Sequence, residues 1–196
     1  MGEIKSAAEI AREKLEKMGE ATEAERLKWK YVPEGEKLAA RYIKENCNLA
    51  SELDKYEAKA RRYIVEGTSD ILIRNISLPK NDVIKRTNKK AMEGLKTVKN
   101  DKVAVENVFS KIRHVLDHYV EQGEQQKRQA YESLKTEFEA KVQQAIQQQI
   151  GINAKMKIDV EKQPQFQEEW QKLQAQFDSQ YLKLLDEYKQ EIAAIA

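Results

Sequence analysis

Apolar residues recur every three or four positions along most of the chain, a spacing typical of helices with one buried face. This pattern predicts helices over about residues 3–18, 35–46, 51–78, 82–98, 102–150 and 164–195. Ser51 and Asp54 have the spacing of a capping box, and Asn81 or Asp82 can cap the helix that follows. Residues 20–33 break the pattern, so we expect an irregular loop before Pro33. The sequence therefore predicts an all-α fold.

Two long apolar stripes dominate the last third of the chain. The first stripe contains Tyr131, Leu134, Phe138, Val142 and Ile146, and the second contains Phe166, Trp170, Leu173, Phe177, Tyr181, Leu184, Tyr188, Ile192 and Ile195. Because short connections favour antiparallel neighbours, the two stripes are expected to pair as a helical hairpin with a coiled-coil-like stalk. Counting from the turn places Trp170 opposite residues 142–145 and Tyr181 opposite residues 131–134. The competing arrangement pairs the same stripes across a homodimer.

The segment between the two stripes changes character. Residues 152–160 alternate strictly between apolar and polar side chains, which is the period of a strand. No second candidate strand accompanies it, so an extended connector at 151–163 is the other interpretation. The missing partner strand favours the connector, although the sequence alone does not decide between the two.

A compositional change near residue 121 suggests two parts. All 17 glutamines lie between residues 122 and 190. Residues 121–128 are polar on every face and include Gly123, which makes them a candidate hinge. We therefore expect a helical domain over 1–120 and an antiparallel hairpin over 121–196.

Composition favours a soluble cytoplasmic protein without cofactors. Charged residues make up 35% of the chain, its net charge is +2, and Cys47 is the single cysteine. One thiol excludes an internal disulfide and a cysteine-based zinc cluster. Residues 1–20 lack the apolar core of a secretory signal, and no run approaches the roughly 20 apolar residues that span a bilayer. We expect no membrane association.

The two histidines are the sharpest chemical candidates. His114 and His118 lie four residues apart with Asp117 beside them, and histidines at this helical spacing can chelate zinc or iron. However, both point roughly 160° away from the apolar stripe of the same helix, at about 100° per residue. The ordinary interpretation is therefore a solvent-exposed pair, and a metal site is the alternative.

Two further surfaces are candidates for partner binding. Residues 80–102 contain eight Lys or Arg and three acids. Within them, the pair Lys85 and Arg86 lies one helical turn from the pair Lys89 and Lys90. Such a face could contact the phosphates of RNA or of the ribosome, although a charge-rich exposed helix is the ordinary explanation. The stripe of the last helix is expected to pack internally. Its end, from Tyr188 to Ile195 and including Ile192, is the part most expected to touch another protein.

Two stretches carry a resemblance to known sequences. They are EIKSAAEIA at 3–11 and EG followed by DILIRNISLP between 66 and 79. They resemble a family of small prokaryotic all-helical proteins without an assigned activity, over most of residues 3–100. The resemblance implies a bacterial helical fold and brings no catalytic residue.

Together these patterns favour a non-enzymatic helical scaffold or adaptor, with a protein partner whose identity and pathway the sequence does not reveal. The second hypothesis is an RNA- or ribosome-binding protein that uses residues 80–102. The third is a metal-dependent enzyme or metal-binding protein that uses His114 and His118. No catalytic or cofactor-binding residue is predicted.

Overall fold

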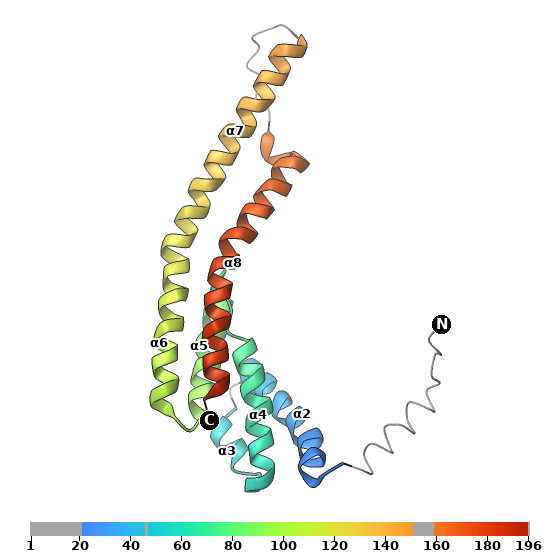
Figure 1. Cartoon of the computed structure of the whole chain (residues 1–196), viewed down its shortest axis with the longest axis vertical. Coiled ribbons are helices and arrows are strands. Elements are labelled where there is room, and N and C mark those ends of the chain that lie inside the picture. The colour runs from blue at the N-terminus through green and yellow to red at the C-terminus, as the bar shows by residue number, and fades with distance from the viewer. Residues whose placement is uncertain (1–20, 46, 151–158, 196) are drawn as a thin grey trace, which may run out of the picture. The chain divides into compact units, whose positions relative to one another are not determined.

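The computed structural model describes residues 21–45, 47–150 and 159–195, and these residues are almost entirely helical (Figure 1). The helices are α2 (Glu23–Lys44), α3 (Leu49–Leu53), α4 (Ala58–Arg74), α5 (Asp82–Val98), α6 (Lys102–His118), α7 (Glu124–Ile150) and α8 (Pro164–Ala194). A π-helical turn, η1 (Tyr119–Gly123), joins α6 to α7, and a 3₁₀ turn, η2 (Val160–Lys162), precedes α8. The all-α prediction is confirmed over the described ranges, which contain no strand. The predicted helix at 3–18 and most of the alternating segment 152–160 lie outside them.

Two compact units make up the described chain. The first unit contains residues 21–76, 87–105 and 193–195, and the second contains residues 77–86 and 106–192. The predicted division into 1–120 and 121–196 places the boundary elsewhere in the chain, and it stays a prediction. None of the described helices combines the length and the apolar character that crossing a membrane requires.

In the first unit, α2 replaces the loop predicted over residues 20–33. A capping box starts the helix: the Thr22 side chain accepts a hydrogen bond from the Glu25 N–H, and the Glu25 carboxylate accepts one from the Thr22 N–H at 2.8 Å. The helix then continues through Pro33 to Lys44. The loop prediction was wrong because it gave too much weight to Pro33, which lies on the exposed side of α2.

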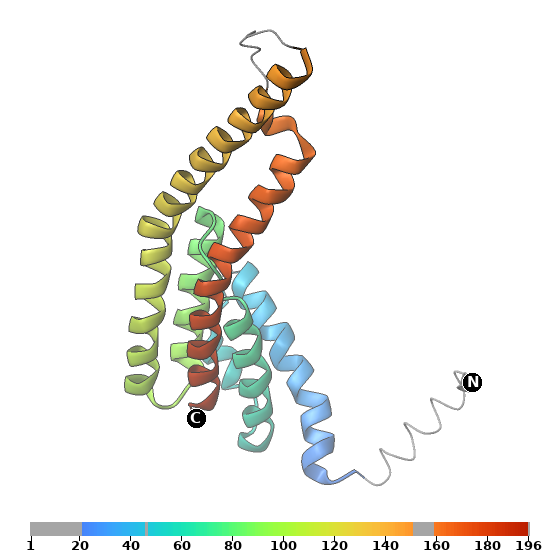
Figure 2. The same ribbon diagram turned by 45° about the horizontal axis from the view of Figure 1, so that its top comes forward.

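Two glycines bring α2 and α4 into backbone contact. A Cβ atom added to Gly35 would lie 2.1 Å from the Ile64 carbonyl oxygen, and one added to Gly67 would lie 2.1 Å from the Val32 carbonyl oxygen. The Thr68 hydroxyl also donates a hydrogen bond to the Gly35 carbonyl at 3.1 Å. These helices therefore cross at a distance that only glycine permits, side by side in both views (Figures 1 and 2).

The predicted helix over 51–78 is interrupted. Asn48 caps α3 by accepting a hydrogen bond from the Ser51 N–H at 3.2 Å, so Ser51 lies inside a helix and does not start one. The chain then turns before α4 begins at Ala58. The predicted capping box at Ser51 was therefore wrong, because Asn48 three residues earlier already fills that role. The predicted helix at 82–98 is confirmed, with Asn81 accepting a hydrogen bond from the Ile84 N–H at 2.9 Å.

In the second unit, α8 runs in the opposite direction to α6 and α7. Contacts pair the start of α8 with α7 and its end with α6: Phe166 packs edge-on against Phe138 at 5.4 Å, and Lys111 pairs with Glu191 at 2.8 Å. The predicted register was wrong. Trp170 meets Tyr131, and Tyr181 meets Tyr119, with ring centroids 5.0 and 5.1 Å apart.

The register differs because α8 does not begin opposite the end of α7. Glu161, just before α8, pairs with Lys135 at 2.5 Å. The last turns of α7 therefore extend beyond the first residue of α8, and every residue of α8 lies opposite an earlier part of α6 or α7 than predicted.

Candidate functional site: a buried polar cluster at the π-turn

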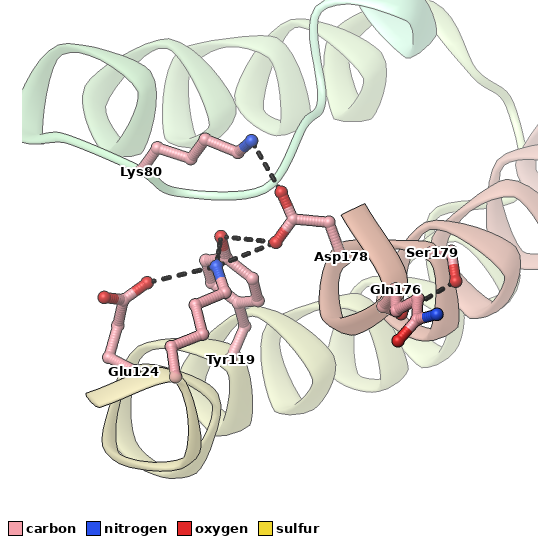
Figure 3. A network of polar contacts seen from close by, with 7 residues as sticks. Lys80, Tyr119, Glu124, Gln176, Asp178 and Ser179 are labelled. Atoms are coloured by element: carbon pink, nitrogen blue, oxygen red, sulfur yellow. Dashed lines mark hydrogen bonds and ion pairs between the residues drawn. The ribbon is translucent and has the colours of Figure 1, made fainter. Parts of the chain in front are cut away.

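A cluster of buried polar side chains lies where η1, α7 and α8 meet in the second unit (Figure 3). Lys127 and Asp178 are each 8% exposed, and Tyr119 is 1% exposed. Burying a charge in a protein is costly unless the charge is paired and hydrogen-bonded. The presence of two such charges therefore requires a set of partners.

Short contacts supply these partners. The Lys127 Nζ atom donates to the Tyr119 hydroxyl oxygen at 2.6 Å and to Asp178 Oδ1 at 2.8 Å. The Tyr119 hydroxyl in turn donates to Asp178 Oδ1 at 3.0 Å, and Lys80 Nζ pairs with Asp178 Oδ2 at 2.6 Å. Glu124 Oε1 lies 3.5 Å from Lys127 Nζ. Every polar side-chain atom of the central three residues therefore has a partner.

The same contacts fix the protonation states of the cluster. Burial alone would raise the pKa of Asp178, but hydrogen bonds from Lys127, Lys80 and Tyr119 lower it below the usual value. Burial alone would lower the pKa of Lys127, but its hydrogen bonds with Asp178 and Tyr119 raise it. Burial raises the pKa of Tyr119. The cluster is thus a carboxylate, an ammonium group and a neutral phenol throughout the neutral pH range.

Tyr181 covers the π-turn from α8. Its ring packs edge-on against Tyr119, and its hydroxyl lies 2.9 Å from His118 Nδ1. A Cβ atom added to Gly123 would lie 3.2 Å from the Tyr181 hydroxyl oxygen. Gly123 therefore leaves the space in which Tyr181 sits. Gly123 was interpreted from the sequence as part of a candidate hinge over residues 121–128.

A recess of about 230 Å³ opens beside the cluster. Its lining consists of Lys80, Tyr119, Glu124, Lys127, Trp170, Gln174 and Asp178. Sites for small organic ligands usually enclose about 300–1,000 Å³. The recess is smaller than that range, and the groups of the central cluster already satisfy one another.

The histidine pair lies on the exposed side of α6. His114 and His118 are both exposed, with ring centroids 6.5 Å apart. Among the residues that the structure describes, no group of three or more His, Cys, Asp or Glu side chains is arranged to hold a metal ion. The solvent-face interpretation agrees with this exposure, and the contact of His118 with Tyr181 gives that ring a packing partner. Metal binding stays a prediction.

The predicted basic residues differ in their surroundings. Lys85, Arg86 and Lys89 are exposed. Lys85 pairs with Asp82 at 3.5 Å, and the Arg86 Nε atom donates to the Asp82 carbonyl oxygen at 3.2 Å. Lys90 is half-buried, and its Nζ atom donates to the Glu45 carbonyl oxygen at 2.9 Å. The Lys90 ammonium group therefore forms a hydrogen bond within the first unit.

The two predicted partner-binding residues at the end of α8 also differ. Ile192 is fully buried, with 0% of its surface exposed, so it cannot form a surface for another protein in this structure. The apolar stripe is therefore covered at Ile192 within this chain, and partner binding through this residue stays a prediction. Tyr188 is half-buried, and Lys111 Nζ lies 5.4 Å from the centre of its ring.

Comparison with known proteins adds one finding. The model of the family DUF6657, described as a family of unknown function, matches residues 50–194. The chain belongs to this family. The match agrees with the predicted resemblance to an uncharacterised helical family, but it covers a later part of the chain and leaves out residues 3–11. A prokaryotic origin stays a prediction. No curated protein and no solved structure matches the chain.

Proposed function

We propose that this DUF6657 chain is a non-enzymatic helical interaction protein, which presents the outer part of a hairpin formed by α7 and α8 to another macromolecule. The observation that supports the proposal is the incomplete burial of α7. From Arg128 to Gln148, no side chain of this helix is buried. The half-exposed side chains nevertheless include five large apolar ones: Tyr131, Leu134, Phe138, Val142 and Ile146.

The facing part of α8 has the same character. Trp170, Leu173 and Phe177 are half-buried, whereas Phe166 is covered. Removing apolar surface from water contributes roughly 25 cal/mol per Å². A partner that covers the remaining exposed parts of these residues would therefore gain affinity without any rearrangement of the hairpin.

The buried cluster supports the non-enzymatic part of the proposal. A general acid or base works best when its pKa lies near the operating pH. Here the pKa values of Lys127 and Tyr119 are raised and that of Asp178 is lowered, so each group is moved away from neutrality. Such a cluster orients helices and has no proton to exchange at neutral pH.

Affinity capture with a matched pair of baits tests the proposal. Leu134 and Val142 are half-exposed, and both would be replaced by Gln in one variant. The control variant replaces Ser133 and Ala140, which are exposed on the same helix, by Gln. Mass spectrometry of native lysate should identify a protein that the parent and the control retain and that the Leu134→Gln/Val142→Gln variant loses, at equal helicity. Equal retention by all three baits would exclude this face as the binding surface.

The other two functions stay predictions. Exposure of Lys85, Arg86 and Lys89 is the observation that keeps RNA or ribosome binding as the second candidate. The histidine pair keeps metal binding as the third. A cytoplasmic location and a homodimer also remain predictions.

A further inference from the structure

The apolar stripe of the second unit changes phase where α6 joins α7. Phe109, Ile112 and Leu116 in α6 and Tyr119 at the start of η1 are buried and share one face. Tyr131, Leu134, Phe138, Val142 and Ile146 share one face of α7. If residues 106–150 formed an uninterrupted α-helix at about 100° per residue, the second face would point roughly 80° away from the first. Its apolar side chains would then turn away from α8.

The π-turn removes this mismatch. Tyr119, Gly123, Lys127 and Tyr131 follow one another at four-residue steps, each of which exceeds a full α-helical turn by about 40°. Three such steps accumulate about 120°. In η1 the Glu124 N–H donates to the Tyr119 carbonyl oxygen, five residues earlier, so that this turn accommodates one additional residue. The additional residue rotates α7 back about the helix axis by about 100°, and this rotation aligns the apolar face of α7 with that of α6.

Contacts across the turn agree with this alignment. Lys127 reaches the hydroxyl of Tyr119 at 2.6 Å although the two residues are eight positions apart. Tyr181 on α8 lies against both Tyr119 and Gly123. The residues at the four-residue steps therefore share the side of the helix that faces α8.

We propose that η1 is a phase-setting joint: its one extra residue turns the apolar face of α7 toward α8, and the cluster of Tyr119, Lys127 and Asp178 locks the joint in this phase. If the joint became a regular α-helical turn, α7 would rotate about its axis by about 100°. The position that each residue of α7 now occupies would then be taken by the preceding residue. Ala130, Glu137 and Lys141 would then face α8 in place of Tyr131, Phe138 and Val142. The joint thus determines which face of α7 is covered and which is free, whatever partner the protein has.

A single-residue deletion tests the phase. Removing an interior residue from a helix normally rotates everything beyond it by about 100°. Removing Gln122, which is exposed in η1, should instead convert the π-turn into a regular turn and leave the two stripes aligned. The thermal midpoint measured by circular dichroism should stay within about 5 °C of the parent. Deleting Ser110, which is exposed in α6, should lower it by more than about 10 °C or abolish cooperative unfolding. Equal damage by the two deletions would overturn the proposal.

Crosslinking tests the lock. In a Cys47→Ser background, cysteines replace Glu161 and either Lys135 or Leu134, and a short bis-maleimide bridges the pair. Lys135 and Glu161 are paired in the structure, so the 135–161 bridge should form several-fold faster than the 134–161 bridge. Lys127→Met should raise the share of the 134–161 bridge, because Leu134 takes the place of Lys135 when the joint relaxes. In the Gln122-deleted chain, Lys127→Met should leave the preference unchanged, since no extra residue remains to be released. An unchanged preference in the full-length Lys127→Met chain would overturn the lock.

Discussion

Replacing Asp178 by Asn should destabilise the protein far more than its single charge suggests. The substitution keeps the shape of the side chain and removes the charge that compensates Lys127, which stays buried. Breaking a buried ion pair by removing one partner typically costs about 3–5 kcal/mol. The remaining contact of Lys127 with Tyr119 at 2.6 Å offsets part of this cost, so we expect the lower half of the range, about 3–4 kcal/mol.

The assay is urea unfolding followed by circular dichroism at pH 7. A double variant, Lys127→Met with Asp178→Leu, removes both charges, and replacing a buried pair by apolar residues is often neutral or stabilising. It should therefore be more stable than Asp178→Asn alone. The matched control is Glu168→Gln, because Glu168 pairs with Lys172 at 2.9 Å on the exposed side of α8. That pair should contribute no more than about 1 kcal/mol.

Acidification provides a second measurement of the same contact. The pKa of Asp178 is lowered in the folded state, so its contribution to stability is complete above the unfolded value, about 3.9, and is lost as the pH falls through the folded value. The difference between the parent and Asp178→Asn should therefore be constant from pH 5 to 8 and shrink below about pH 4. A loss of less than about 1 kcal/mol at pH 7 would refute the view that these charges depend on each other.

Three further outcomes are expected. Gly67→Ala should destabilise the first unit by several kcal/mol or prevent its folding in thermal melts, because the new Cβ would lie 2.1 Å from the Val32 carbonyl oxygen; a small change would show that α2 and α4 can separate at little cost. If residues 80–102 bind RNA, the complex should weaken steeply with added salt and disappear when Lys85, Arg86 and Lys89 become Glu, whereas salt-independent binding, or none at low salt, rejects that hypothesis. Protein purified without a tag should contain stoichiometric zinc or iron if His114 and His118 bind metal, and metal-free protein of unchanged stability leaves them as surface residues.

Local signals in the sequence predicted what depends on neighbouring residues. The helix over 82–98 was predicted with its observed bounds, because Asn81 supplies a cap next to a regular apolar period. The last helix was predicted from residue 164, which is where α8 begins. Where local signals conflicted with packing, packing prevailed: Pro33 suggested a break, yet α2 continues through it and lies against α4.

The features that sequence reasoning missed depend on residues far apart in the chain. Gly35 and Gly67 are 32 positions apart, and their role becomes visible only when α2 and α4 are placed side by side. The register of α8 was wrong for a similar reason, since the position of Glu161 against Lys135 depends on the path of the chain between the two helices. Helical periodicity determines which face of a helix is apolar, and it leaves the position along the partner helix free.

The polar cluster lies between these two cases, because part of its signal was local. Residues 121–128 were interpreted as a candidate hinge because they are polar. Tyr119, Gly123, Lys127 and Tyr131 follow one another at four-residue steps, which drift by about 120° in a regular α-helix and share one face only with the π-turn. A lysine on the apolar face of a helix needs a carboxylate from elsewhere, and Asp178 beside Phe177 on the last helix meets that need. Because this pair joins α7 to α8 and the π-turn sets the phase of α7, the two features depend on each other. The buried charges are satisfied in the phase that also turns Tyr131 and Phe138 toward α8, so the cost of leaving these charges unpaired acts against other registers of the two helices.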